Sequence, residues 1–306
     1  MDRNFEGLTC LVTGGAGFIG SHLVEALAAA GAQVRVLDDL SSGSLDNLAA
    51  VADRIEMHRG SVLDADLVRA LTEGCRFVFH LAAVVSVARS FDEPVPCHRV
   101  NAEGALVVAE AASRAGARLV LSSSAAVYGD NPNLPLPESQ NLAPLSPYGA
   151  QKAYGEMIVG AYRAGVALRY FNVYGPRQDP SSPYSGVVSI FARRMAAGQP
   201  ITVFGDGKQT RDFVYVDDVV RANMRAALSD ARGAYNVCTG RPVSLLELIE
   251  ILGRLLQPVE VAFAEPRIGD IRHSAGDPRS AENDLGFIAR TTIGEGLAKL
   301  AAGQVA

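Results

Sequence analysis

The sequence predicts an α/β fold, with a doubly wound parallel sheet followed by a smaller mixed α/β lobe at the C-terminal end. Three observations support this. Short apolar runs alternate with helical segments through the first half of the chain, a glycine-rich turn follows the first of these runs, and the segments become shorter and more interrupted after Asn172. Strands that are joined by helices run parallel and are buried on both faces, which suits continuous apolar runs.

The elements of the main sheet follow one another in the first 171 residues. An apolar run at 8–12 ends in glycine, an alanine- and leucine-rich helix at 21–30 ends at Gly31, and a second run at 33–37 ends at Asp38. Further strands are expected at 54–58, 77–81, 119–121 and 166–171, with helices between them, one of which begins at Pro147. We expect residues 1–171 to form one domain.

The remaining residues, 172–306, are expected to form mainly a second lobe that caps the sheet. The dipeptides Gly175-Pro176, Asp179-Pro180 and Ser182-Pro183 interrupt regular structure there. A helix is expected at 187–197, strands at 201–204 and 213–216, and helices at 217–228 and 245–256. Segments near 212–238 are expected to return to the first domain.

Composition excludes several classes of partner. The 306 residues carry a net charge of −5, which gives no reason to expect nucleic acid or an anionic membrane. No apolar run is long enough to span a bilayer, and the N-terminus lacks the pattern of a signal peptide, so we expect a cytoplasmic protein. The four cysteines form no Cys-x-x-Cys pair and are expected to be reduced thiols, and the five histidines lack ligand spacing, so no metal is expected.

The glycine-rich turn predicts a dinucleotide site. Gly14, Gly17 and Gly20 follow a strand and open a helix, where glycine lets phosphate approach and the helix N-terminus offers free N–H groups. Asp38 ends the second strand, where an acid accepts hydrogen bonds from the adenosine ribose and would repel a 2′-phosphate. Together with Asp39, it favours NAD over NADP on a Rossmann-type sheet. The alternative is a glycine turn with a packing role only.

A second motif predicts proton transfer. Tyr148 and Lys152 are spaced to lie on one face of a helix, and Ser124 ends a strand upstream. The Lys152 ammonium, with a positive nicotinamide ring, would favour the phenolate, and lowering its pKa by about three units corresponds to roughly 4 kcal/mol. The Ser124 hydroxyl can bridge the reacting oxygen and the phenol. Tyr-x-x-x-Lys alone is a loose pattern that also occurs on helix surfaces, but with the glycine motif it indicates redox chemistry at a carbinol.

Together these segments resemble the extended short-chain dehydrogenase/reductase family, and most closely its nucleotide-sugar 4-epimerases of the UDP-glucose/UDP-galactose type. The resemblance covers nearly the whole chain. The matching segments are 13–20, 80–83, 101–104, 122–129, 169–172, 211–218 and 267–274. Ser61 departs from the family, because relatives usually place an aspartate there near the adenine.

The resemblance implies a set of site residues. The catalytic residues would be Ser124, Tyr148 and Lys152. NAD would be held by Gly14, Gly17, Phe18, Ile19, Asp38, Asp39, Ser42, Gly43, Ser61, Val62, Leu81, Ala82, Ala83, Asn101, Ser122, Tyr148, Lys152 and Tyr170. The UDP-sugar would contact Ser86, Ser124, Asn172, Val187, Val203, Phe204, Arg211, Arg267 and Ser274.

The roles within the substrate set differ. Arg211 and Arg267 would clamp the substrate diphosphate, which guanidinium forks suit, and Asn172 would join them. The strand at 201–204 would flank the uracil. Ser274 occupies a position that is bulky in epimerases restricted to unsubstituted hexoses. We therefore expect UDP-GlcNAc and UDP-GalNAc to be accepted as well as UDP-Glc and UDP-Gal.

The expected reaction depends on Ala125 and Ala126. The related 4,6-dehydratases carry Asp-Glu at these positions, and decarboxylating relatives keep an acid there too. Alanine transfers no proton, so elimination is disfavoured and the expected reaction is simple oxidation and reduction at C4. Tyr148 would take the 4-hydroxyl proton while NAD takes the C4 hydride, and the 4-keto sugar would rotate and receive the hydride on its other face.

Two other functions remain open. A UDP-glucuronate 4-epimerase, or another nucleotide-sugar oxidoreductase, would need an added cation near C6, for which Arg89 is the candidate. A noncatalytic NAD-binding sensor or scaffold is the alternative of another class, although such proteins usually lose the tyrosine or lysine. The resemblance further implies a homodimer, with the stretches 94–115 and 147–164 as candidate contact helices.

Overall fold

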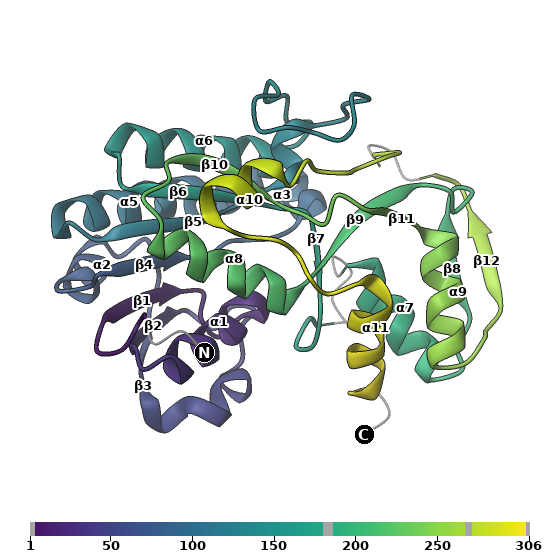
Figure 1. Cartoon of the computed structure of the whole chain (residues 1–306), viewed down its shortest axis with the longest axis horizontal. Coiled ribbons are helices and arrows are strands. Elements are labelled where there is room, and N and C mark those ends of the chain that lie inside the picture. The colour runs from purple at the N-terminus through teal and green to yellow at the C-terminus, as the bar shows by residue number, and fades with distance from the viewer. Residues whose placement is uncertain (1–3, 180–185, 267–270, 304–306) are drawn as a thin grey trace.

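The computed structural model describes residues 4–179, 186–266 and 271–303. It contains a seven-stranded sheet with helices on both faces, beside a smaller lobe formed by later parts of the chain (Figure 1). The strand order of the large sheet is β10-β6-β5-β4-β1-β2-β3, and every pair of neighbours is parallel. The predicted α/β fold with a doubly wound parallel sheet is therefore confirmed.

The strands of this sheet match the apolar runs, with one informative difference. Their bounds are β1 (Thr9–Thr13), β2 (Gln33–Asp38), β3 (Ile55–Arg59), β4 (Phe77–His80), β5 (Arg118–Ser124), β6 (Gly165–Tyr170) and β10 (Gly233–Val237). The strand expected at 119–121 continues through three serines, because their backbone still pairs with β6 up to Ser124 and Tyr170. Serine side chains give no apolar signal, so this extension was not predicted.

Two cores, one on each face, hold helices against the sheet. Val12 of β1 packs with α1 (Phe18–Ala29) and α8 (Val216–Leu228), whereas the adjacent Leu11 packs with α2 (Ala65–Thr72) and α5 (Gly104–Ala115). Helix α6 (Pro147–Tyr162) lies beside α5 on the second face. The alternation of neighbouring side chains between the faces is the expected property of a strand buried on both sides.

Short helical segments complete the large domain. They are the 3₁₀ segments η1 (Leu45–Arg54) and η3 (Ala125–Tyr128), the π-type turn η2 (Arg99–Glu103), and the helices α3 (Val87–Asp92), α4 (Pro94–His98) and α10 (Arg279–Leu285). Helix α10 packs on β10, at the edge of the sheet. No helix within the described ranges is both long enough and apolar enough to cross a membrane.

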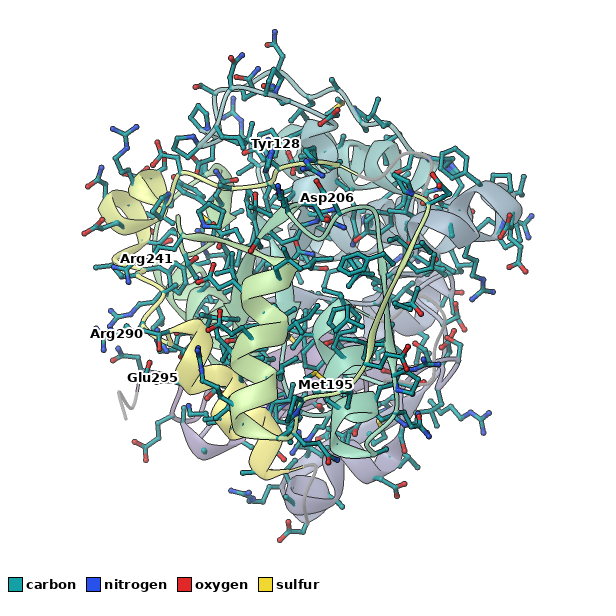
Figure 2. The ribbon with its side chains drawn as sticks, turned by 90° about the vertical axis from the view of Figure 1, so that its right-hand side faces the viewer. Tyr128, Met195, Asp206, Arg241, Arg290 and Glu295 are labelled. Carbon is teal, nitrogen blue, oxygen red and sulfur yellow. The ribbon has the colours of Figure 1, made fainter. Side chains whose placement is uncertain are left out.

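The smaller lobe has two short sheets and its own core. Strands β7 (Asn172–Tyr174), β9 (Thr210–Tyr215) and β11 (Pro242–Ser244) form one sheet, and β8 (Ile201–Phe204) pairs with β12 (Val261–Ala264). Helices α7 (Val187–Ala196), α9 (Leu245–Leu255) and α11 (Ile293–Ala302) pack around them. Seen from the lobe side, Met195 of α7 lies beside α9, and Glu295 lies on α11 (Figure 2).

The connections place the lobe at one edge of the main sheet. Strand β7 follows β6 after one residue, so the lobe begins at the carboxyl end of β6. The chain returns to the first domain through α8 and β10, while β9 stays in the lobe. In open α/β sheets the carboxyl ends of the strands are where ligands bind. The lobe therefore stands beside the edge at which the predicted site residues end their strands.

Candidate active site

The glycine turn between β1 and α1 leaves no room for side chains at two positions. Gly14 has φ +69°, and a Cβ there would lie 2.6 Å from the Ala82 nitrogen, while a Cβ on Gly20 would lie 2.1 Å from the Gly14 carbonyl oxygen. Helix α1 therefore begins at Phe18 and includes Gly20, whereas helical propensity had placed its start at residue 21. Packing against the turn explains the difference.

The start of α1 is suited to an anionic group. Gly17 is its N-cap, no side chain of the described residues caps it, and its first turn carries no acid. The first N–H groups of a helix need acceptors, and the helix dipole favours negative charge there. A Cβ on Gly17 would meet only the Gly14 oxygen within 4 Å, at 3.3 Å. This side of the turn is therefore open to a diphosphate.

Asp38 is held beside the same turn. Its Oδ2 accepts a hydrogen bond from the Ala16 N–H at 2.9 Å, and its Oδ1 accepts one from the Leu40 N–H at 2.8 Å. A carboxylate has further lone pairs, so ribose hydroxyls remain possible donors. Asp39 is exposed and accepts the Ser41 N–H. The loop 42–44 packs against Ala16, so the candidate ribose site and the glycine turn form one surface.

The remaining predicted cofactor residues follow the ends of β3 and β4. Ser61 is partly exposed, and its Oγ accepts the Leu63 N–H at 3.2 Å. Val62 is buried, and a Cβ on Gly104 would lie 2.7 Å from its Cγ2. Residues 81–83 follow β4 and are partly exposed, as are Phe18 and Ile19 at the start of α1.

Thr13 and His80 form a buried pair that the sequence did not reveal. The Thr13 Oγ1 and His80 Nδ1 atoms are 2.7 Å apart, at the ends of the adjacent strands β1 and β4. Burial, assisted by the charge of Lys152, lowers the pKa of His80 to about 3, so its ring is neutral. The pair fixes the strand ends from which the glycine turn and residues 81–83 emerge.

Ser124, Tyr148 and Lys152 lie together at the carboxyl end of β5. The Ser124 side chain lies near enough to the Tyr148 phenol to lower the pKa of that phenol, and its hydroxyl accepts the Ala126 N–H at 3.2 Å. The Lys152 ammonium donates to the Ser122 carbonyl at 2.9 Å and lies 5.9 Å from the centroid of the Tyr148 ring. Both Tyr148 and Lys152 are buried. The serine, tyrosine and lysine are thus arranged for proton transfer.

Burial acts against ionisation of this group in the protein alone. It raises the pKa of Tyr148, and the neighbouring Ser124 side chain offsets this rise only in part. It also lowers the pKa of Lys152 to about 8, against the opposing charge of Glu156. The loss of hydration on burial therefore affects these two pKa values more than the attraction between the Lys152 ammonium and a Tyr148 phenolate does. A Tyr148 phenolate would therefore need further positive charge, which a bound NAD would supply.

Two predicted cofactor residues use their side chains inside the protein. Asn101, in the π-type turn η2, accepts the Val84 N–H at 2.8 Å and donates to the Gln151 Oε1 at 2.8 Å. The Tyr170 hydroxyl donates to the Asn223 Oδ1 at 2.9 Å in the core. Asn101 thereby fixes the segment after β4 and the helix of Tyr148, a role that the sequence did not indicate.

The predicted substrate residues gather around β7 and β9. Asn172 is exposed and lies opposite Phe213, two residues after Arg211. The Arg211 Nη1 donates to the Thr210 carbonyl, and the Ser274 N–H donates to that same oxygen at 3.1 Å. Arg211 and Ser274, far apart in sequence, are therefore neighbours.

The other substrate predictions have different environments. Val203 is fully buried in the core of the lobe, whereas Phe204 and Val187 are partly exposed. Ser86 is buried, and its Oγ caps α3 by accepting the Arg89 N–H at 3.0 Å. Arg267 lies outside the described residues.

Asp212 was missed as a site residue, although it directly follows Arg211. It is fully buried, and its carboxylate accepts the backbone N–H groups of Thr239 at 2.8 Å and of Gly240 at 2.9 Å. A longer contact of 3.4 Å comes from the Gly276 N–H. Asp212 thus joins β9 to the segment after β10 and to the segment that carries Ser274.

The parallel sheet, its glycine-rich turn and the serine, tyrosine and lysine grouped at the end of β5 indicate the class of dinucleotide-dependent enzymes. Residues 10–238 match the model of the NAD dependent epimerase/dehydratase family, and the chain belongs to that family. Its cofactor is accordingly NAD. A UDP-glucose 4-epimerase from Mycolicibacterium smegmatis is 44% identical over 94% of this chain and 96% of its own length.

Solved structures agree with this membership. The UDP-glucose 4-epimerase of Thermotoga maritima, solved with UDP-glucose, has a TM-score of 0.92 and 38% identity, covering 96% of this chain and 98% of that one. A UDP-N-acetylglucosamine 4-epimerase from Methanobrevibacter ruminantium, in complex with UDP-N-acetylmuramic acid, has a TM-score of 0.93 and 38% identity, covering 97% and 98%.

Proposed function

We propose that this enzyme epimerises a UDP-hexose at C4, interconverting UDP-glucose and UDP-galactose through a transient 4-keto sugar. The observation that carries the proposal is the grouping of Ser124, Tyr148 and Lys152 next to a turn whose first residues are Ala125 and Ala126. The group suits proton transfer at a hydroxyl, and the alanines supply no acid or base for elimination or decarboxylation.

In this proposal the protein moves one proton and holds the reactants. Tyr148 accepts the 4-hydroxyl proton, and Ser124, which lies near the phenol, carries a hydrogen bond to the same sugar oxygen. Lys152 supplies positive charge from the next turn of α6. Bound NAD supplies the hydride acceptor. After the keto sugar has rotated and received the hydride on its other face, Tyr148 returns its proton to the 4-oxygen, so no proton or cofactor is consumed.

The division of labour between the two parts of the chain belongs to the same proposal. Residues 1–171, with α8 and β10, would bind NAD, and the rest of 172–306 would bind the nucleotide sugar. Arg211 would contact the diphosphate together with Arg267 and Asn172. The convergence of β7, β9 and the Ser274 segment supports this assignment, because it gathers polar groups beside the carboxyl end of β6.

We infer that the enzyme also accepts UDP-GlcNAc and UDP-GalNAc. Ser274 supports this inference because a small side chain stands next to Thr210 and Arg211, where a bulky one would crowd the sugar. The similar likeness to the two solved epimerases, one named for UDP-glucose and one for UDP-N-acetylglucosamine, is compatible with both substrate pairs. The uronate alternative is less well supported, since the Arg89 guanidinium is paired with Glu93 at 2.9 Å.

We also propose a homodimer in the cytoplasm. The candidate contact helices expose large apolar side chains, with Met157 on α6 64% exposed and Val95 on α4 66% exposed. A second copy would cover such side chains. The four buried cysteine thiols fit a reducing compartment.

Incubation of the purified protein with UDP-galactose, without added cofactor, tests the proposed reaction. We expect proton NMR to show UDP-glucose accumulating to equilibrium, and a Tyr148→Phe variant to be slower by about 10²–10⁴-fold, the usual contribution of general acid–base catalysis. If wild-type protein shows no conversion but releases NAD on denaturation, C4 epimerisation of UDP-hexoses is excluded and a uronate becomes the next substrate to test.

A further inference from the structure

A buried ion pair lies directly behind the catalytic lysine. Glu156 is one helical turn after Lys152 on α6, and Arg169 is on the adjacent strand β6. The Arg169 Nη2 and Glu156 Oε2 atoms are 2.7 Å apart, and the Arg169 Nε lies 3.0 Å from Oε1. Their side chains are only 6% and 8% exposed. Such pairs are costly to bury and often add little net stability, so stability alone does not explain this pair.

Glu156 and Lys152 both bind strand β5, which ends at Ser124. The Ser123 hydroxyl donates to the Glu156 carboxylate, and Lys152 donates to the Ser122 carbonyl. These two bonds attach successive turns of α6 to the two residues that precede Ser124. The position of Ser124 relative to Tyr148 is therefore set by bonds from this helix to the two residues before Ser124.

Arg169 keeps the Glu156 carboxylate oriented and links it to the rest of the molecule. Its Nη1 donates to the Tyr128 hydroxyl at 2.8 Å, and its guanidinium lies 4.8 Å from the centroid of that ring. Tyr128 in turn donates to the Asn236 Oδ1 at 2.7 Å on β10 (Figure 2 labels Tyr128). With partners on α6 and η3 and a further bond to the Glu138 carbonyl at 3.2 Å, the guanidinium has little freedom to release Glu156.

Few charges reach Lys152 in its enclosed position. His80 faces it from β4 and Tyr148 lies on its own helix, but a neutral imidazole and a phenol offset no positive charge. Arg169 and Tyr128 lie beyond Glu156, and the Glu138 carboxylate is bonded to the Asn236 N–H further away. Within the described ranges, Glu156 is the acid whose charge opposes the effect of burial on the Lys152 pKa.

We propose that Glu156 is a positioning residue of the reaction, which keeps Lys152 positively charged in a water-poor site and holds the serine strand at its working distance from Tyr148. The proposal rests on the catalytic roles assigned to Tyr148 and Lys152 above. The buried ion pair is then part of the catalytic apparatus, because Arg169 and Ser123 orient the Glu156 carboxylate.

The composition of the chain offers a direct test. Only three of its 28 basic residues are lysines, at positions 152, 208 and 299, and the other two lie near the surface. Protein labelled with carbon-13 at lysine Cε should give three NMR signals, and Lys152→Met identifies the one of interest. In NAD-free wild-type protein we expect its titration midpoint well below that of the two other lysines.

Glu156→Gln should lower the Lys152 midpoint by roughly one pH unit or more, since removal of a negative charge disfavours the ammonium. The alkaline limb of the pH profile of kcat should move to lower pH by a similar amount. Ser123→Ala is the matched control: it removes a bond to Glu156 but no charge, so kcat should fall while the midpoint and the limb stay in place. An unchanged Lys152 midpoint in folded Glu156→Gln protein would overturn the proposal.

Glu156→Gln leaves Arg169 buried without its partner, so this variant can fail to fold. The double variant Glu156→Gln/Arg169→Met removes both charges and is then compared with Arg169→Met alone. The midpoint should be lower in the double variant, and equal midpoints would overturn the proposal. Because the titration needs neither NAD nor substrate, a shifted midpoint in a protein without epimerase activity would count against the proposed function and not against this role of Glu156.

Discussion

At the scale of single residues, the site encloses two groups whose charged forms are disfavoured by burial. Tyr148 would be an ordinary phenol and Lys152 an ordinary ammonium if both were exposed, but enclosure raises the pKa of Tyr148 and lowers that of Lys152. The protein therefore carries a charged lysine at a cost in stability. Such a cost is common where function needs a group in an unfavourable environment.

Lys152→Met should consequently abolish epimerisation yet leave a protein at least as stable as the wild type at pH 7. The pKa of Lys152 is about 8 in the folded protein and has an ordinary value of 10.5, so between these values the unfolded chain binds more protons. Wild-type stability should thus rise relative to the variant from pH 8 to 10.5, by up to about 3 kcal/mol. Urea unfolding of both proteins at pH 7 and pH 10 measures this, and a constant difference would contradict it.

Ser274→Tyr should separate the two proposed substrate pairs. A bulky side chain next to Thr210 and Arg211 would exclude a 2-acetamido group, so conversion of UDP-GlcNAc should fall by at least tenfold, about 1.4 kcal/mol, while conversion of UDP-galactose changes little. The ratio of the two kcat/KM values is the quantity to measure. Ser274→Ala, which keeps the residue small, should retain both activities. Equal loss on both substrates in the tyrosine variant would rule out this role.

At the scale of elements, the glycine turn shows two different uses of glycine. Gly20 is needed by the fold, because a Cβ would overlap the Gly14 oxygen, whereas a Cβ on Gly17 meets only one protein atom, on the side of the turn that we assign to the diphosphate. We expect Gly17→Ala to fold with a melting temperature near that of the wild type but to lose NAD. Gly20→Ala should lose several degrees of melting temperature as well. Thermal unfolding and the NAD content of purified protein distinguish the two, and equal melting temperatures would refute the assignment.

Elements with a strong apolar pattern were predictable, and those held by polar contacts were not. The strands at 33–38 and 77–80 match expectation within a residue because buried parallel strands are continuously apolar. The extension of β5 through its serines and the placement of β9 in the lobe depend on backbone pairing between distant segments. A local pattern contains no information about such partners.

The candidate site divides in the same way. The glycine turn and the Tyr148–Lys152 spacing are local motifs and could be read directly. Glu156 and Asp212 act through contacts with distant residues, so the sequence marked neither. Val203 was placed beside the substrate by resemblance, although strand alternation turns its side chain into the core of the lobe.

At the scale of the whole molecule, topology assembles the site. The carboxyl ends of β1, β2, β4 and β5 bring the glycine turn, Asp38, residues 81–83 and Ser124 to one edge of the sheet. Strand β7 continues from β6 at the same edge and carries the chain into the lobe. In the proposed site, each part would therefore contribute one face, and neither part would hold all of its residues.

The proposed dimer makes a prediction at this scale. Met157→Arg places a charge on the exposed face of α6 and should convert the protein to a monomer, because an unpaired charge is costly inside an apolar contact. Sedimentation equilibrium gives the molecular mass directly. Ile288→Arg is a matched control, since Ile288 is a similarly exposed apolar residue outside the candidate contact helices. A dimer that survives Met157→Arg would refute the proposed contact.

In the proposed reaction, hydride leaves C4 and returns to the same carbon from the other side. The most direct measurement uses UDP-galactose with deuterium at C4, mixed with UDP-galactose that is uniformly carbon-13 labelled, followed by mass spectrometry and NMR of the UDP-glucose formed. We predict that deuterium stays at C4 of the carbon-12 molecules. Loss of deuterium to water, or its appearance in the carbon-13 product, would contradict an enclosed hydride transfer and return.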